Sequence, residues 1–336
     1  MAALLVFIVF LVGIAISLPI ATSMIVGSIA PIFLMDKGGS IAQLLNNTFS
    51  GANSTPILAV PLFILGGVIM SEGGISQKLF NFFAYFVGKL PGGIPCAVIL
   101  TCLFYGAISG SGPATVAAIG GLTIPTMIKQ GYDTGYSGAI AAAAGSIGVV
   151  IPPSIPMVMY SVATGASVGA LFLGGIVPGL IIGLSLMLYT KWYCTKRQYI
   201  NKESQPFSWK TVGHSLADGI WALLVPVIIL GGIYGGIMTP TEAAAIAAFY
   251  GLIVGLFLYK EMDFKCLINS CIESCETSAV IIVLMAMATL FQLQDQLSDT
   301  PEGLPCGSIQ DSPDFGWRGM MVDVGRYHYP MKEIYN

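Results

Sequence analysis

One polar stretch in an otherwise apolar chain has residue types that could bind a cation. Residues 106–121 read GAISGSGPATVAAIGG, in which glycines separate Ser109 from Ser111 and Pro113 follows. Clustered glycine and proline are poor helix formers, so we predict that the backbone leaves the helical conformation here and releases carbonyl oxygens. Carbonyl and hydroxyl oxygens are the ligands that hard cations prefer, so this stretch predicts an ion site.

A second break follows in AGSIGVVIPPSIP, residues 144–156, where two prolines are adjacent and Ser146 and Ser154 add hydroxyls. No charged residue occurs in 91–128 or 134–190. A site without nearby carboxylates suits a weakly bound monovalent ion such as sodium. Helix N-termini that follow each break would favour an anionic substrate group beside that ion.

The residues of both breaks are therefore the candidate site. The ion-binding candidates are Ser109, Gly110, Ser111, Gly112, Pro113, Gly145, Ser146, Pro152 and Pro153, and the substrate-binding candidates are Ser154 and Thr115. Sodium is expected as the coupling ion, with no cofactor and no other metal. For any single glycine, tight packing between membrane helices is the alternative interpretation. That alternative fits the Ser-Gly-Ser-Gly-Pro run and the Pro-Pro break poorly.

The elements that position these residues must lie in a membrane. The 336 residues are 55% hydrophobic and only 9% charged, whereas ordinary soluble domains carry roughly 25% charged residues. The apolar runs are continuous rather than alternating, and a helix needs about 20 such residues to cross the bilayer. We therefore predict an all-α polytopic membrane protein. The net charge of −3 gives no sign of a nucleic-acid partner.

Apolar and polar stretches divide the chain into five parts. These are membrane helices with a polar connector (1–53), a first inverted repeat with a hairpin at 91–128 and a broken helix at 134–163 (54–190), a basic loop (191–218), the start of a second repeat (219–291) and an atypical polar tail (292–336). The pieces around the first break are short for two full crossings, which favours a re-entrant hairpin. The positive-inside rule predicts that the basic loop faces the cytoplasm.

The two halves share an order of segments. An apolar segment (55–70), a segment with helical apolar spacing (76–90) and an apolar block that ends in a polar tip (91–113) correspond to 243–259, 260–276 and 280 onward. Repeats with helices broken at corresponding positions indicate a secondary transporter. Segment 76–90 is expected either to lie at the membrane surface or to pack against protein as a connector.

Glu242, the cysteines and the possibility of an enzyme are considered next. Thr241 could cap a helix with Glu242 in its first turn, or Glu242 could be an ion-binding carboxylate. The seven cysteines contain no CxxC pair, so neither a disulfide framework nor a zinc site is expected. The apolar blocks contain no group of residues that could act together as nucleophile, base and acid, so an enzyme is not expected.

Several long motifs, in the right order, resemble the large membrane subunit of tripartite ATP-independent periplasmic (TRAP) transporters, the DctM-like subunit. The motifs are GAISGSGPATVAAIGGLTIPTMIKQGYD, AAAAGSIGVVIPPSIPMVMYSVATGASVGALFLGGIVPGLIIG, PILAVPLFILGGVIMSEGGIS and GGIYGGIMTPTEAAAIAAFYGLIVG. The resemblance covers about residues 1–291.

The resemblance implies a multi-pass importer in the inner membrane of a bacterium or archaeon, with the inverted repeats of the ion-transporter superfamily. Such importers use a sodium gradient, a small membrane subunit and a periplasmic substrate-binding protein. Their substrates are carboxylates such as C4-dicarboxylates or sialic acid, and transport is an elevator movement. By similarity, Ser109–Pro113 and Gly145–Pro153 would clasp one sodium ion.

The resemblance ends at about Phe291, because residues 292–336 offer no counterpart to the family's second hairpin tip and second broken helix. A truncated or frameshifted chain is expected rather than a soluble tail, because a lone hairpin arm would have to pack without its partner. The alternative to a permease is therefore a remnant or scaffold subunit that does not transport.

Overall fold

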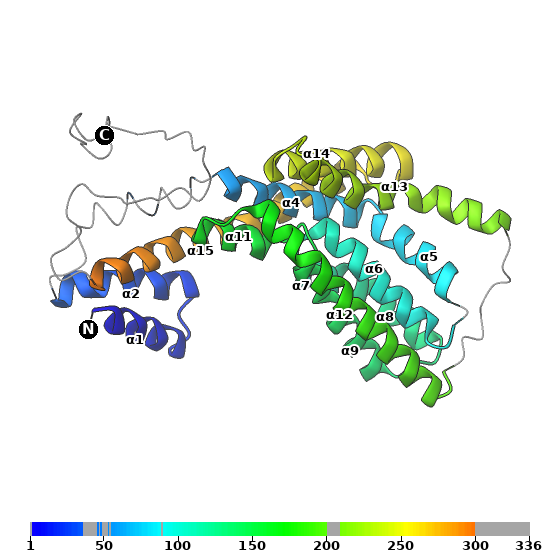
Figure 1. Cartoon of the computed structure of the whole chain (residues 1–336), viewed down its shortest axis with the longest axis horizontal. Helices are drawn as coiled ribbons and strands as arrows, with labels where there is room; N and C mark the ends of the chain where they lie inside the picture. The colour runs from blue at the N-terminus through cyan, green and yellow to red at the C-terminus, as the bar shows by residue number, and fades with distance from the viewer. Residues whose placement is uncertain are drawn as a thin grey trace. The chain divides into compact units, whose positions relative to one another are not determined.

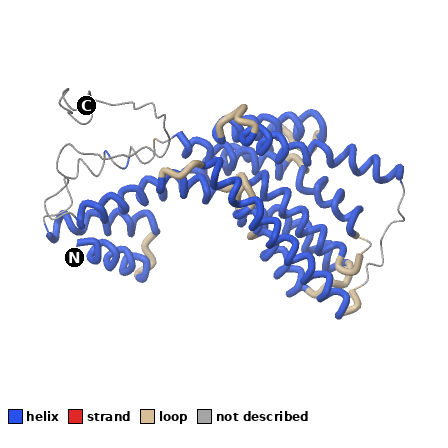
Figure 2. The backbone as a smooth tube through the Cα atoms, in the orientation of Figure 1, coloured by secondary structure: helices blue, strands red, loops and turns tan. Residues whose placement is uncertain are grey.

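The computed structural model describes residues 2–35, 46, 48, 53, 55–88, 90–199 and 209–299. These ranges contain helices and loops and no strand, as Figure 2 shows. Four helical stretches are long and apolar enough to cross a membrane: 134–164, 168–196, 240–259 and 264–288. The predicted all-α polytopic membrane fold is thus confirmed.

The chain divides into two compact units, residues 1–49 with 286–336 and residues 50–285. In the first unit, α1 (Ala2–Ala15) packs against α2 (Ile20–Met35). The helices are separated by a short non-helical stretch that ends at Pro19. A side chain at Gly13 would overlap Ser23, so the two helices approach closely at this point.

The second unit holds both predicted breaks (Figure 1). Its elements are α4 (Thr55–Glu72), α5 (Ile75–Val87), α6 (Gly93–Ser109), α7 (Gly112–Thr115), the π-helix η1 (Val116–Gly120), α8 (Gly121–Lys129), α9 (Thr134–Gly145), α10 (Ile147–Val150), α11 (Ile155–Thr164), α12 (Val168–Lys196), α13 (Trp209–Tyr234), α14 (Pro240–Ile253), the π-helix η2 (Val254–Tyr259) and the start of α15 (Phe264–Asp299).

Helices α6, α8, α9 and α12 lie side by side (Figure 1). Helix α4 makes its most extensive contact with α14, and small residues line that contact. A Cβ at Gly66 would come within 3.3 Å of the Ala248 amide nitrogen, and one at Gly73 would lie 3.2 Å from the Gly255 Cα. Small residues let membrane helices approach closely, so these glycines serve packing.

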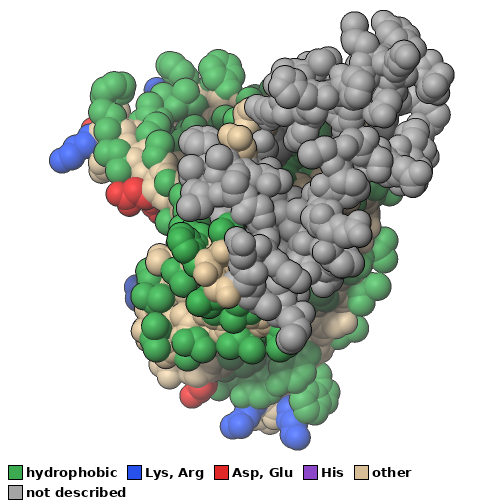
Figure 3. Space-filling model, turned by 90° about the vertical axis from the view of Figure 1, so that its left-hand side faces the viewer, with side chains coloured by type: hydrophobic (Ala, Val, Ile, Leu, Met, Phe, Trp, Pro, Cys, Tyr) green, Lys and Arg blue, Asp and Glu red, His purple; other side chains and the backbone are tan. Residues whose placement is uncertain are grey.

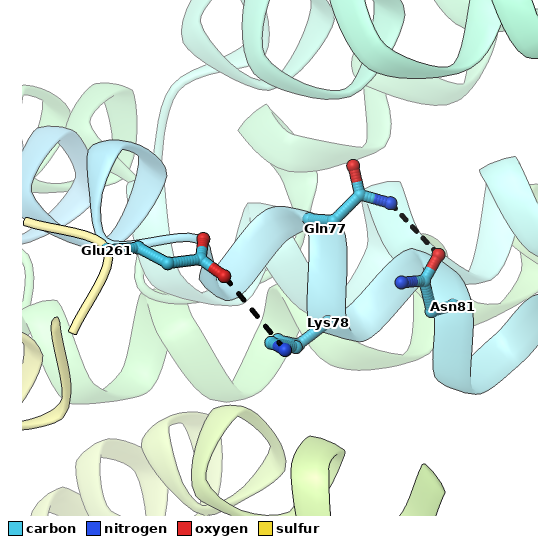
Figure 4. A network of polar contacts seen from close by, with 4 residues as sticks. All are labelled: Gln77, Lys78, Asn81 and Glu261. Atoms are coloured by element: carbon cyan, nitrogen blue, oxygen red, sulfur yellow. Dashed lines mark hydrogen bonds and ion pairs between the residues drawn. The ribbon is translucent and has the colours of Figure 1, made fainter. Parts of the chain in front are cut away.

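A sharp bend separates α4 from α5, whose axes differ by 65°. Gly74 has a φ of 77° at the bend, a backbone conformation that favours glycine. Glu261 lies against Gly74 and pairs with Lys78, with Oε1 and Nζ 3.9 Å apart, and Gln77 donates a hydrogen bond to Asn81 at 2.9 Å (Figure 4). Helix α5 therefore turns away from the direction of α4 and carries a polar side.

Hydrophobic side chains cover much of the described surface on the face in Figure 3, and charged side chains gather at a few places. Helix α12 exposes Leu173, Val177, Leu180, Leu184 and Leu188, which recur at helical spacing. A water-facing helix would not carry such a stripe, whereas lipid tails solvate it well. The exposed stripe is what a multi-pass membrane protein requires.

The second half differs from the first in one connection. The sequence suggested separate segments at 260–276 and from 280 onward, but α15 is one continuous helix over Phe264–Asp299. In the first half, Gly88, Pro91 and Gly92 separate α5 from α6. No glycine or proline interrupts residues 264–291, so nothing in the sequence stops the helix there.

The cap of α14 also differs from the prediction. Thr239, not Thr241, is the N-cap, because Pro240 occupies the first helical position and begins the helix earlier. The Glu242 carboxylate accepts hydrogen bonds from the Thr239 amide at 2.7 Å and from its hydroxyl at 2.9 Å. Of the two roles considered for Glu242, the structure shows the capping one.

Candidate ion and substrate site

The first break is a sharp turn at the end of α6. The Gly110 amide donates to the Gly106 carbonyl at 2.9 Å, and Gly110 has a φ of 62°, which ends the helix. Ser111 is extended and precedes α7, with Pro113 in the first turn of the new helix. The chain then returns through η1 and α8, which both contact α6.

Three hydroxyls gather at this turn. The Ser109 Oγ lies 3.0 Å from the Thr115 Oγ1, which in turn donates to the Ser111 carbonyl at 2.7 Å. The Ser111 Oγ accepts a long hydrogen bond of 3.5 Å from the Ala114 amide. Ser109 and Thr115 are buried and Ser111 is half-buried. The side chains and backbone thus place several oxygen atoms within one turn of chain.

The second break lies between α10 and α11. Ile151–Pro153 are non-helical and buried, and the bond between Pro152 and Pro153 is cis. The Ser154 hydroxyl donates to the Val149 carbonyl at 2.6 Å, which ties the two sides of the break together. The helix restarts at Ile155, directly after this bond.

The two breaks contact each other. The Ile155 amide donates to the Gly110 carbonyl at 3.1 Å. A Cβ at Gly110 would lie 2.8 Å from the Pro153 carbonyl oxygen, and one at Gly112 would lie 3.4 Å from the Gly145 carbonyl oxygen. The backbones of the two breaks therefore satisfy part of each other's hydrogen-bonding capacity inside the protein.

A cavity of about 320 Å³ lies beside the first turn. Its polar lining comes from three elements, namely Ser71 and Glu72 of α4, Tyr105, Ser109 and Ser111 of α6 and its turn, and Glu273 and Thr277 of α15. Its apolar lining includes Ile64, Ile155 and Ile281, and none of the described residues that line it is basic. Two carboxylates with several hydroxyls favour a cation in this space over an anion.

Not every candidate residue turns toward the other break. Pro113 is exposed. Ser146 is also exposed, and its hydroxyl donates to the Ala143 carbonyl of its own helix at 2.7 Å. Ser109, Gly110, Gly112 and Thr115 are buried where the breaks meet. The roles assigned to these residues in ligand binding stay predictions.

The cavity also includes residues that the motifs did not single out. Gly67, Glu72, Tyr105 and Glu273 lie outside both breaks in the sequence. Only the pair of charges could have drawn attention, because carboxylates are uncommon beside apolar segments of this kind. Nothing local to Tyr105 or Gly67 marks either residue.

Comparison with known proteins gives a consistent result. The sequence profile of the tripartite ATP-independent periplasmic transporter DctM component matches residues 7–303. The match extends beyond Phe291, where the motifs had suggested that the resemblance ends. The chain is 55% identical over 251 residues to the isethionate TRAP transporter permease protein DctMQ of Oleidesulfovibrio alaskensis, an alignment that covers 75% of this chain and 39% of that protein.

Other relatives carry different substrates in their names. The chain is 44% identical over 267 residues to the C4-dicarboxylate large permease protein DctM of Vibrio cholerae, covering 78% of this chain and 57% of that protein. It is 38% identical over 320 residues to the 2,3-diketo-L-gulonate TRAP transporter large permease protein YiaN of Escherichia coli. This alignment covers 93% of this chain and 73% of that protein. The chain thus spans less than two thirds of the length of the first two relatives.

Proposed function

This chain belongs to the DctM component family of tripartite ATP-independent periplasmic transporters, and on that premise we propose that it is the permease of a sodium-coupled importer of organic acids. Permeases move solutes and leave them chemically unchanged, so the chain is not an enzyme in this proposal. The inner membrane is its proposed location. Because the chain spans only part of its relatives, the proposal concerns the transporter to which it contributes.

One observation carries the choice of a cation as the coupling species. The cavity beside Ser109 and Ser111 combines hydroxyls with the carboxylates of Glu72 and Glu273, and no basic side chain lines it among the residues that the structure describes. Oxygen ligands without a positive partner attract a hard cation. Because Glu72 and Glu273 are exposed and the oxygens of the turn are neutral, we propose a monovalent ion such as sodium rather than a divalent one.

An anionic substrate is supported by the two helices that begin at the breaks. The segment 112–129 and helix α11 both begin where Gly110 meets Ile155, so the positive ends of two helices converge. Anionic groups bind readily at such positions. The relatives are named for isethionate, C4-dicarboxylates and diketogulonate, which are all organic anions. We therefore propose a small carboxylate or sulfonate as the solute, with Ser154 and Thr115 near it.

The proposed partners follow from the family description. A periplasmic binding protein would deliver the acid, and a small membrane subunit would complete the permease. Movement of the hairpin and broken helix against the rest of the protein would carry the site across the membrane. In this mechanism, a cation bound at the turn would offset the charge of the acid, which couples the two solutes.

Uptake into liposomes tests the proposal. The complete transporter is reconstituted with its binding protein, and accumulation of radiolabelled isethionate or succinate is measured with sodium or potassium outside. We expect accumulation only with inward sodium and only with the binding protein. Uptake that is equally fast in potassium would refute sodium coupling.

A serine pair locates the ion. Ser111→Ala removes a hydroxyl that lines the cavity, and the matched Ser137→Ala removes a buried hydroxyl of α9 that bonds only to Asp133 of its own helix at 2.9 Å. We expect the sodium requirement to weaken in the first variant and to persist in the second. An unchanged sodium requirement in Ser111→Ala removes this residue from the site.

A further inference from the structure

Helix α4 touches the first turn at two neighbouring points. The Tyr105 hydroxyl of α6 donates a hydrogen bond to the Gly67 carbonyl of α4 at 3.2 Å. One turn further along α6, a Cβ at Gly67 would lie only 3.0 Å from the Ser109 Cα and 3.2 Å from its Cβ. The same residue of α4 therefore receives a hydrogen bond from α6 and bears directly on the serine that ends α6.

The hydrogen bond is sheltered from water. Tyr105 has only 1% of its surface exposed and is among the largest fully buried side chains of the described residues. Tyr105 lines the cavity, together with Gly67, Ser71 and Ser109. A buried hydroxyl is costly to leave unpaired, so its partner fixes the distance between α4 and α6.

The close approach between Gly67 and Ser109 is rigid because backbone atoms of α4 and of α6 lie next to each other there. Ser109 cannot retreat by changing a rotamer, since its Cα itself is the near atom. The next residue, Gly110, is held by its bond to the Ile155 amide at 3.1 Å. A displacement of Ser109 would therefore pass to the turn and to the start of α11.

The oxygen atoms of the turn depend on where Ser109 lies. Its Oγ is 3.0 Å from the Thr115 Oγ1, which is also bonded to the Ser111 carbonyl. A shift of a few tenths of an ångström at Ser109 changes the spacing of these oxygens, and ion affinity depends on that spacing. We infer that Gly67 and Tyr105 are positioning residues, through which α4 sets the geometry of the ion-binding oxygens. The inference rests on the proposed function for the identity of the ion.

Two variants test the inference in the complete transporter. Tyr105→Phe removes only the hydroxyl, and Gly67→Ala adds a methyl group against Ser109. The controls are Tyr132→Phe, a buried tyrosine whose hydroxyl has no partner among the described residues, and Gly121→Ala, a helical glycine with open space around it. Equilibrium binding of radioactive sodium to the reconstituted protein gives the half-saturating concentration.

We expect Tyr105→Phe to raise the half-saturating sodium concentration about fivefold, the order that loss of one neutral hydrogen bond predicts. Gly67→Ala should raise it further, while both controls stay at the wild-type value. An unaltered sodium affinity in both test variants, in a protein that binds sodium, overturns the inference. The amount of folded protein is compared by gel filtration, so that a loss of folding is not counted as lost affinity.

A second measurement separates this inference from the proposed function. Ser111→Cys is introduced where every cysteine except the buried Cys96, Cys102 and Cys194 is replaced by serine, and its reaction rate with a maleimide is followed. Gly67→Ala should change this rate at least about threefold if the turn moves, whether or not sodium binds. If the protein does not bind sodium, the proposed function is refuted and the positioning role is not. If Gly67→Ala leaves the maleimide rate unchanged, the positioning role is overturned.

Discussion

The Ile155 amide donates a hydrogen bond to the Gly110 carbonyl at 3.1 Å, so the end of one helical break is bonded to the middle of the other. Each break alone would leave backbone groups unpaired within the apolar part of the protein. Joined in this way, the breaks form one structural unit in which Ser109 and Ser111 line a cavity and the Ser154 hydroxyl is bonded to the Val149 carbonyl. A change in either break should therefore affect both.

Gly110→Ala should impair the transporter more than its backbone conformation alone explains. Gly110 has a φ of 62°, and its added Cβ would lie 2.8 Å from the Pro153 carbonyl oxygen. Gly165→Ala is the matched control, since Gly165 has a φ of 72° but nothing within 4 Å. Left-handed backbone costs about 1–2 kcal/mol in both variants. Thermal unfolding in detergent should show a larger loss for Gly110→Ala, and equal losses would contradict the proposed contact between the breaks.

Gly148→Ala should separate α10 from the hairpin. Its Cβ would lie 2.6 Å from the Thr115 Oγ1 and 3.3 Å from the Gly106 Cα, so the methyl group has no room. Overpacking of this kind costs about 1–3 kcal/mol. Gly138→Ala in α9 serves as the control, because nothing lies within 4 Å of its added Cβ. The two variants are compared by their midpoints of thermal unfolding, and a Gly148→Ala midpoint at the wild-type value speaks against the contact.

Thr115→Val should weaken sodium binding while the fold persists. The change keeps the shape of the side chain and removes the oxygen that connects the Ser109 hydroxyl with the Ser111 carbonyl. We expect a rise of about threefold to tenfold in half-saturating sodium, because the remaining oxygens lose their fixed spacing. Thr123→Val is the control, as its buried hydroxyl bonds only to Ile119 of its own hairpin arm at 2.7 Å. Equal sodium affinities in the two variants would argue that Thr115 serves packing alone.

Replacing both cavity carboxylates should lower the affinity for a cation, and the loss should be smaller at high salt concentration. Glu72→Gln combined with Glu273→Gln removes two negative charges from the cavity lining. Both side chains are exposed, so the loss should be about threefold in dilute buffer and smaller in concentrated choline chloride. Glu276→Gln is exposed on the same helix and does not line the cavity. A loss of the same size in Glu276→Gln would show that only the general surface charge matters.

The breaks were predictable because their signals are local. Glycine and proline at 109–113 and 152–153 act on the backbone at their own positions, and the structure has non-helical residues at both places. Unpaired backbone in a membrane must be buried in protein or line a cavity, so the sequence allowed either arrangement and did not specify that the breaks meet. The absence of glycine and proline in 264–291 was equally visible, and it explains the continuous α15.

The cavity could not be predicted because its residues are far apart in the chain. Tyr105 and Gly67 are 38 positions apart, and neither residue type suggests the other. Ser146 shows the converse problem. Its residue type suited a ligand, but its position between α9 and α10 leaves it exposed, with its hydroxyl bonded to Ala143 of α9. Side-chain direction depends on helix rotation, which composition does not specify.

Helix α4 carries two consecutive glycines with different neighbours. Gly66 meets Ala248 of α14, and Gly67 meets Ser109, while Gly74 forms the bend eight residues after Gly66. Each added or removed residue turns a helix by about 100° and moves it by about 1.5 Å. Between Gly67 and the bend, a substitution alters the contacts of one position, but an insertion or deletion would rotate Gly66 and Gly67 relative to everything beyond the bend. Evolution should therefore conserve the length of this segment more strictly than its composition.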